Sequence, residues 1–144
     1  VARTEQTQKH LQGLCRHLIE GLKKMQEGFP ELRIRFNPLV DEDETRQFSG
    51  MVNFSFPPVE GEVILHHLEV KDIFVGLGSA CSAQSREPSK ILIGIGLSEE
   101  QARCSLRISF SHNNTTDEID RFLEAFAEAY RALYSTFLQK ADHR

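Results

Sequence analysis

The sequence has little of what membrane spans and secreted proteins need. No run of apolar residues approaches the ~18 that a membrane-spanning helix requires. Residues 1–6 are polar, unlike the apolar segment of a signal peptide. These absences favour a cytoplasmic protein with no membrane partner.

Cysteine is scarce as well. The chain has three cysteines, Cys15, Cys81 and Cys104, and no Cys-x-x-Cys spacing joins any two of them. An odd number without that spacing argues against a disulfide framework and a structural zinc site. Adjacent His66 and His67 do not suggest a metal site either, because neighbours on a helix point about 100° apart and cannot chelate as an i, i+4 pair does.

Neither sign of charge is gathered into a block that would attract a partner. Charged residues make up 26% of the chain and the net charge is −4, so nothing indicates nucleic acid binding. The acidic run 41–47 lacks the residue pattern of a calcium loop, and we interpret it as a solvated connector. At 144 residues the chain predicts a single domain, 1–144, which can bury roughly 70% of its unfolded surface.

Hydrophobic periodicity predicts the helices and strands. Helical spacing or helix-start residues predict helices over 4–27 and 60–69, from Pro88, and at the two capping boxes 98–101 and 115–118. Period-two alternation or short apolar runs predict strands over 32–36, 51–56, 71–75 and 104–110. The order predicts an α+β fold, a small, mostly antiparallel sheet with helices packed on it.

Two apolar patterns are interpreted as core packing rather than as signs of a functional site. Cys15 lies on the apolar stripe of the first helix, and free cysteine is among the most buried residue types. The last helix carries an aromatic stripe at helical spacing over 119–137, which is typical of core packing.

Cys81 stands among small residues in a segment with no obvious core anchor. Gly76 and Gly78 tolerate positive φ, so we expect a mobile loop that exposes the thiol. A thiol with an ordinary pKa near ~8.5 is only a few per cent thiolate at neutral pH. A nucleophilic role therefore needs a cation or a helix N-terminus, for which Arg86 and the Pro88 helix are candidates. The alternative is an incidental exposed thiol.

Arg107 lies on the polar side of the strand 104–110, whose other side is apolar. Its planar guanidinium suits bidentate capture of a carboxylate. The alternative is a surface charge paired with one of the many acidic residues.

Four motifs in order carry a resemblance to a known family. They are Gly78-Ser79-Ala80-Cys81-Ser82, Glu87-Pro88-Ser89, the run from Gly96 to Arg103 and the run from Ser105 to Phe110. Together they closely resemble the C-terminal small domain of cysteine desulfurases, which are pyridoxal-phosphate enzymes of the class V aminotransferase family. The resemblance implies the small-domain fold of fold-type I pyridoxal-phosphate enzymes.

The resemblance also implies roles for two residues. Cys81 would be the catalytic nucleophile that takes the sulfur of L-cysteine as a persulfide and leaves L-alanine. Arg107 would bind the substrate α-carboxylate. The long loop of small residues resembles the subgroup that passes sulfur to iron–sulfur scaffolds or tRNA-thiolation partners.

Cofactor and partners follow from the same resemblance. The intact enzyme would be a homodimer that binds pyridoxal phosphate and hands sulfur to an acceptor protein. The chain starts at Val1 and has no segment matching the family's cofactor lysine. We therefore expect a fragment that lacks the large cofactor-binding domain, binds no cofactor or metal itself, and is inactive alone.

Two departures from the family and two alternative functions stand beside this interpretation. Residues 111–114 replace a Gly-Arg pair that many members carry, and Leu77 stands where serine is common. One alternative is a stand-alone sulfur carrier or docking module that accepts persulfide on Cys81. The other is a selenocysteine lyase or aminotransferase relative.

Overall fold

The fold is an antiparallel sheet with its long helices on one side. The computed structural model describes residues 2–37, 50–77 and 98–142. In chain order its elements are α1 (Ala2–Gly28), β1 (Arg35–Phe36), β2 (Met51–Ser55), α2 (Gly61–Val70), β3 (Gly76–Leu77), α4 (Glu99–Arg103), β4 (Ser105–Ser109) and α5 (Thr116–Asp142).

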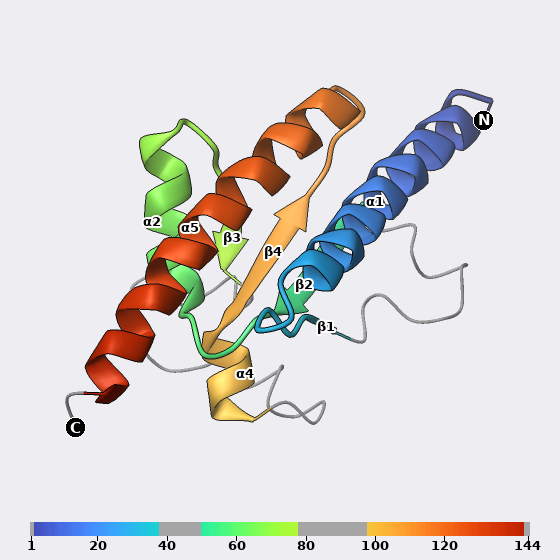
Figure 1. Ribbon diagram of the computed structural model, residues 1–144. Helices are drawn as coiled ribbons and strands as arrows, with labels where there is room; N and C mark the ends of the chain where they lie inside the picture. Colours follow the sequence, from blue (N-terminus) through green and yellow to red (C-terminus); the bar gives the residue numbers. More distant parts are fainter. Residues whose placement is uncertain (1, 38–49, 78–97, 143–144) are drawn as a thin grey trace.

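The four strands pair in the order β1-β2-β4-β3, and every pair is antiparallel. β2 and β4 form the longest ladder, from Met51 opposite Ser109 to Ser55 opposite Ser105. Figure 1 shows β4 beside β2, with β3 at the other edge of β4. The predicted α+β class is confirmed.

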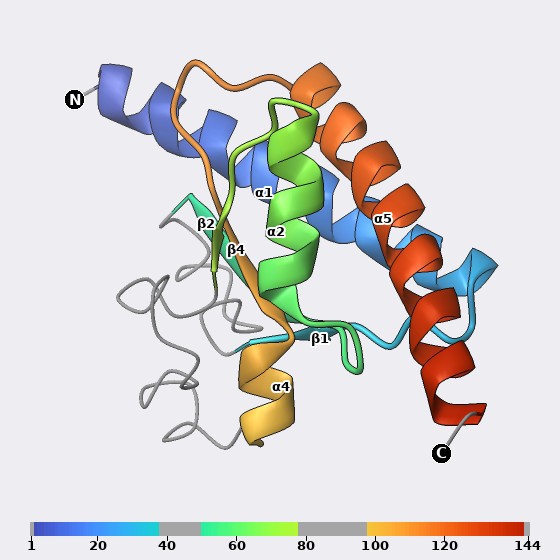
Figure 2. The same ribbon diagram turned by 90° about the vertical axis from the view of Figure 1, so that its left-hand side faces the viewer.

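The three longest helices lie on one side of this sheet. Figure 2 shows α1, α2 and α5 on the same side of β2 and β4. The core forms between these layers because alternate strand residues point toward the helices. Among its fully buried side chains are Leu18, Leu22, Val52, Phe54, Phe56, Ile64, Leu68, Leu106, Phe126 and Tyr130.

The aromatic stripe of α5 packs into this core as predicted, except at its end, where Phe137 is 45% exposed. Phe126 meets Phe54 and Phe56 at centroid distances of 5.7 and 5.2 Å in edge-to-face geometry. This arrangement suits the quadrupoles of the rings. Cys15 is also buried, 2% exposed, as its place on the α1 stripe predicts.

Side-chain contacts fix where the later helices begin. Ser98 Oγ accepts the N–H of Gln101, and the Gln101 side chain accepts the N–H of Ser98. Thr115 and Glu118 exchange the same two bonds at the start of α5. Both predicted capping boxes are confirmed.

The predicted strand 71–75 is wrong. Asp72 has a positive φ of 59°, and the N–H of Ile73 donates to the carbonyl of Leu68, so these residues close the end of α2. The strand comes later, as β3, and it includes Gly76, which the sequence predicts to be loop. Gly76 is not among the described glycines with a positive φ. Helix termination therefore outweighed the local apolar pattern.

The predicted strand 32–36 is shorter than expected. Only Arg35 and Phe36 pair with β2. The N–H of Ile34 donates instead to Oε1 of Gln26 on α1, at 2.8 Å. Leu32 is buried all the same, so the alternation predicted burial better than strand pairing.

Three other predictions lie outside the described residues. They concern the acidic connector 41–47, the loop that carries Cys81, and the helix expected from Pro88.

Gly61 makes the tightest contact between α2 and the sheet. A Cβ atom on Gly61 would lie 2.2 Å from the backbone carbonyl oxygen of Ser105. Neither atom belongs to a flexible side chain, so α2 or β4 would have to move to admit a methyl group. The start of α2 is therefore held directly against the strand that carries Arg107.

We predict that Gly61→Ala lowers the free energy of unfolding by about 3 kcal/mol, the upper end of the usual overpacking cost. Gly13→Ala is the matched control, because a Cβ there meets nothing within 4 Å. That change should raise stability by about 0.5–1 kcal/mol through helix propensity. Urea unfolding of both variants measures the difference, and equal stability of the two would contradict the contact.

Candidate functional site

The structure places one of the two predicted site residues. Arg107 lies in the middle of β4, whereas Cys81 lies outside the described residues. The described part of the candidate site is therefore Arg107 with its neighbours on β2 and β3.

Alternation along β4 decides which way Arg107 faces. Leu106 and Ile108 are buried toward the helices, so Arg107 lies on the opposite side of the sheet. There it is directly opposite Asn53 of β2 and Gly76 of β3. We call this side, with Asn53, Ser55, Gly76 and Arg107, the polar face.

The guanidinium of Arg107 lies over Gly76. A Cβ atom on Gly76 would be 3.1 Å from one terminal nitrogen of Arg107 and 3.2 Å from Nε. Nε itself is buried and has no hydrogen-bond partner among the described residues. A buried donor without an acceptor costs about 1–3 kcal/mol, and the described residues supply no acceptor for this one.

A buried polar cluster lies on the β2 side of Arg107. We call Asn37, Asn53 and Ser55 the asparagine cluster; their exposed fractions are 0%, 2% and 0%. The side-chain amide of Asn37 donates to Oδ1 of Asn53, and its backbone N–H donates to the carbonyl of Asn53 at 3.0 Å. Ser55 Oγ donates to Oδ1 of Asn37 at 3.4 Å.

Sequence reasoning missed the asparagine cluster. The alternation over 51–56 predicts a strand, but it says nothing of what the polar residues between the apolar positions contact. Asn53 and Ser55 occur at alternate positions of an otherwise apolar strand, and Arg107 interrupts the paired strand in the same way. Polar residues at such positions predict a side of the sheet that lies outside the apolar core.

The described cysteines do not have the character of nucleophiles. Burial raises the pKa of Cys15 to about 11. Burial, with a smaller contribution from Glu100, raises the pKa of Cys104 to about 12. Both thiols are free and neutral at physiological pH, so neither has the thiolate character that a nucleophile needs.

The histidine pair belongs to the exposed side of α2. His66 faces Glu62 at 3.8 Å and Glu69 at 3.4 Å, which are neighbours on its own helix. Within the described residues no group of three or more His, Cys, Asp or Glu side chains could hold a metal ion. The same residues include no helix that is both long and apolar enough to cross a membrane.

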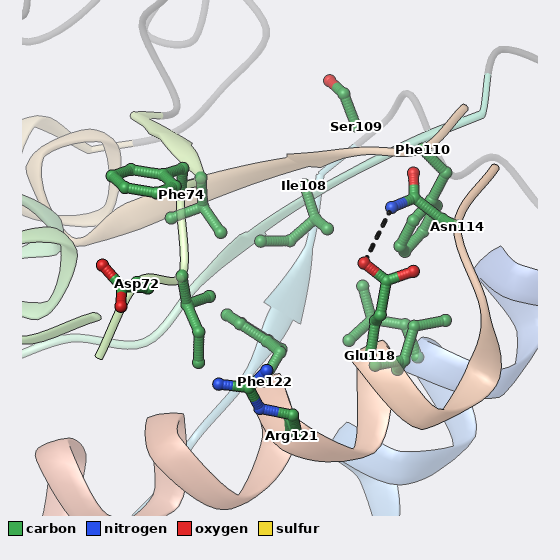
Figure 3. A pocket seen from close by; sticks show the side chains of 13 residues that line it. Asp72, Phe74, Ile108, Ser109, Phe110, Asn114, Glu118, Arg121 and Phe122 are labelled. Carbon is green, nitrogen blue, oxygen red and sulfur yellow. Dashed lines mark hydrogen bonds between the residues drawn. The ribbon is translucent and has the colours of Figure 1, made fainter. Parts of the chain in front are cut away.

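A separate pocket of about 270 Å³ lies on the helix side of β4. Figure 3 shows Phe74, Ile108 and Phe122 around it, with the side chain of Asn114 bonded to Glu118 at 3.5 Å. Arg107 does not line it. The pocket and the arginine are on opposite sides of the strand.

The family of the chain is identified by comparison with known proteins. The family model described as aminotransferase class-V matches residues 2–122. The chain belongs to the aminotransferase class-V family.

Similar members of the aminotransferase class-V family are cysteine desulfurases by name. The cysteine desulfurase IscS of Clostridium botulinum (strain Hall) is 39% identical over 114 residues, which is 79% of this chain and 27% of the relative. Its counterpart in Methanosarcina thermophila is 35% identical over 132 residues, covering 92% of this chain and 30% of the relative. The chain thus spans less than a third of these class-V relatives.

The fold matches solved structures of the same kind. The NifS-like protein of Rickettsia africae aligns with a TM-score of 0.63 and 26% identity, covering 88% of this chain and 29% of that structure. The likeness agrees with the α+β fold and with the family.

Pyridoxal phosphate, which the class-V family implies, does not fit the described residues on their own. This cofactor is held through a lysine. The five described lysines are Lys9, Lys23, Lys24, Lys71 and Lys140; all are exposed and lie on α1, on α5 or at the end of α2. None shares the polar face with Arg107. The described part of the chain therefore does not supply a site for this cofactor.

We predict that iodoacetamide at pH 8 labels the native chain on Cys81 alone. With a pKa of about 11, Cys15 is about one part in a thousand thiolate at pH 8, and Cys104 is less. The raised pKa values also mean that the stabilisation from keeping these thiols neutral is present below about pH 9 and is lost as the pH rises toward 11–12.

Mass spectrometry of the labelled peptides provides the check. One label in the native chain and three after unfolding in guanidinium is the expected result, with Cys81→Ser as the control that removes the native label. Native labelling of Cys104 at the rate of a free thiol would contradict its burial.

Proposed function

We propose that this chain provides two functional groups of a cysteine desulfurase, the enzyme that converts L-cysteine to L-alanine and an enzyme-bound persulfide. Arg107 binds the α-carboxylate of the substrate, and Cys81 accepts its sulfur. The observation that carries the proposal is the guanidinium of Arg107, whose buried Nε has no partner among the described residues, on a face lined by neutral polar groups.

A carboxylate suits this guanidinium better than other anionic groups of a small substrate. The guanidinium presents planar, forked N–H donors that match the two oxygens of a carboxylate. Asn53 and Ser55 beside it are uncharged, and no described carboxylate pairs with Arg107 among the ion pairs of the structure. An incoming carboxylate would therefore meet an arginine whose charge no described carboxylate neutralises.

Chain connectivity keeps Cys81 within reach of Arg107. Gly76 of β3 is paired with Arg107, and β3 ends at Leu77, four residues before Cys81. Four residues span at most about 14 Å even when fully extended. A substrate held by its carboxylate at Arg107 is thus within the range of a thiol tethered at position 81.

The proposed sulfur transfer balances without an outside oxidant. The Cys81 thiolate forms an S–S bond to the sulfur of L-cysteine as the C–S bond breaks. The electron pair of that bond stays with carbon, which takes up a proton and becomes the methyl group of L-alanine. The sulfur of Cys81 and the sulfur of the substrate are each oxidised by one formal electron, and the carbon gains both electrons. Arg107 orients the substrate throughout by holding its carboxylate.

The wider context of the enzyme is part of the proposal. Residues 1–144 form the small domain, and a large domain supplies the lysine and phosphate site for pyridoxal phosphate. The intact enzyme is a cytoplasmic homodimer that passes its persulfide to an acceptor protein in iron–sulfur cluster assembly or tRNA thiolation. The names of the relatives support the desulfurase activity, and the coverage of less than a third of their length supports the further domain.

We expect Cys81 to be the residue that carries persulfide. In the intact enzyme, incubation with L-cysteine should add one sulfur atom to the peptide that contains Cys81, and Cys81→Ser should abolish both this gain and alanine release. Intact-mass and peptide-mass measurements follow the sulfur. Unchanged alanine release by Cys81→Ser would overturn the proposal.

The same mass measurement on the 144-residue chain distinguishes a stand-alone sulfur carrier from a fragment of a larger enzyme. A gain on Cys81 only when a pyridoxal-phosphate desulfurase is added would favour a stand-alone carrier. A chain that gains nothing in either condition behaves as a domain that needs its own large domain.

We predict that Arg107→Ala lowers kcat/KM for L-cysteine by about 100-fold in the intact enzyme, mostly through KM. The loss corresponds to about 3 kcal/mol, the upper end for a hydrogen bond to a charged group. Arg107→Lys keeps the charge but loses the fork, so it should recover only part of this loss.

Arg35→Ala is the matched control for the Arg107 variants. Arg35 is exposed on β1 and is paired with Ser55, so it shares the sheet but lies two strands away from Arg107. Its loss should leave KM unchanged. An equal rise in KM for both alanine variants would indicate a diffuse effect of charge and would contradict a carboxylate site at Arg107.

A further inference from the structure

We propose that Asn53 and Gly76 are positioning residues that set the direction of the Arg107 guanidinium. They flank Arg107 on its two neighbouring strands, and we call the space between them the arginine slot. The proposal rests on the carboxylate-binding role of Arg107, and it adds the groups that determine where the carboxylate is held.

The β3 side of the arginine slot is open because residue 76 is glycine. The place where a side chain at this position would begin is 3.1–3.2 Å from Nε and one terminal nitrogen of Arg107. The guanidinium therefore occupies space that a larger residue would fill. A single methyl group could be admitted by a shift of a few tenths of an ångström, whereas a branched side chain could not.

The β2 side of the arginine slot is closed by Asn53. Residues directly opposite on antiparallel strands have Cβ atoms about 4.5–5.5 Å apart, and Asn53 is the direct partner of Arg107. Asn53 is held through both its side chain and its backbone by Asn37, and both residues are buried. This wall is therefore rigid.

The chemistry of residue 53 matters as well as its size. An amide is neutral, so it limits the space available to Arg107 without neutralising the guanidinium. A carboxylate of the same shape would pair with the arginine and compete with the substrate. The asparagine cluster thus holds a neutral wall beside a cation that must remain available.

Restricting the guanidinium has a direct benefit for binding. An arginine side chain carries about 2 kcal/mol of rotamer entropy, part of which is lost whenever its fork is fixed by a ligand. A slot that fixes the fork beforehand reduces that loss. It also directs the fork toward β3, the strand that continues to Cys81.

Three variants test the arginine slot. Gly76→Val fills the open side and should raise KM for L-cysteine about tenfold, with kcat changed less than about threefold. Asn53→Asp keeps the shape of the wall and should raise KM by a similar factor through competition. Gly76→Ala should change KM by less than about threefold, because the arginine end can yield to a methyl group.

Leu77→Val is the matched control for Gly76→Val. Leu77 is the other residue of β3, is paired with Leu106, and packs against the core rather than beside Arg107. The control tests a branched residue in the same strand while leaving the arginine slot intact, so KM should stay at the wild-type value.

A second measurement reports orientation without catalysis. The side-chain Nε–H signal of Arg107 can be assigned in the ¹⁵N-labelled 144-residue chain by its loss in Arg107→Ala. Gly76→Val and Asn53→Asp should shift that signal, whereas Gly76→Ala should shift it less and Leu77→Val should not. Thermal melts of each variant identify any that fail to fold. If Gly76→Val does not fold, Asn53→Asp carries the test, with Gly76→Ala as the variant that should change least.

The outcomes separate this inference from the proposed function. If Arg107→Ala raises KM while Gly76→Val and Asn53→Asp leave both KM and the Nε–H signal unchanged, the arginine slot is wrong and the carboxylate site stands. If Arg107→Ala leaves KM unchanged, the proposed function is wrong, whatever the signal does. Equal effects of Leu77→Val and Gly76→Val would overturn the slot.

Discussion

The pairing of β2 with β4 is the constraint on which the rest of the structure depends. Its register places Val52 beside Ile108 and Phe54 beside Leu106 on the helix side, where all four are buried. The same register necessarily places Asn53 beside Arg107 on the other side. Because side chains alternate with a period of two, a slip of one residue would bury the arginine in the core. Core packing and site geometry are therefore set by the same hydrogen bonds.

Much of this fold could be predicted from the sequence, because its long elements have strong periodicity. The stripe of α1, the capping boxes and the alternation of β4 are local signals, and each was confirmed. The edge strands were less predictable. β1 and β3 have only two residues each, and their extent depends on partners and on the turn at Asp72, which local apolar patterns do not encode.

The candidate site, too, could be predicted only in part from the sequence. Arg107 stood out in the sequence because it interrupts an alternating strand, but its neighbours come from β2 and β3, far away in the chain. Their proximity follows from strand order, which no local pattern contains. The interpretation of Gly76 differs most between the sequence and the structure. The sequence suggested backbone freedom, whereas in the sheet the absence of a side chain gives the guanidinium its space.

β4 is an interior strand, bonded to β2 on one side and to β3 on the other. A residue in such a strand has no backbone freedom with which to follow a ligand of different size, and Gly61 presses on the same strand at Ser105. If Arg107 has the proposed role, an inherited change in the ligand would therefore have to arise beside this residue rather than at it. Among related chains, the residues of the two flanking strands should therefore vary, while the arginine and its strand should not.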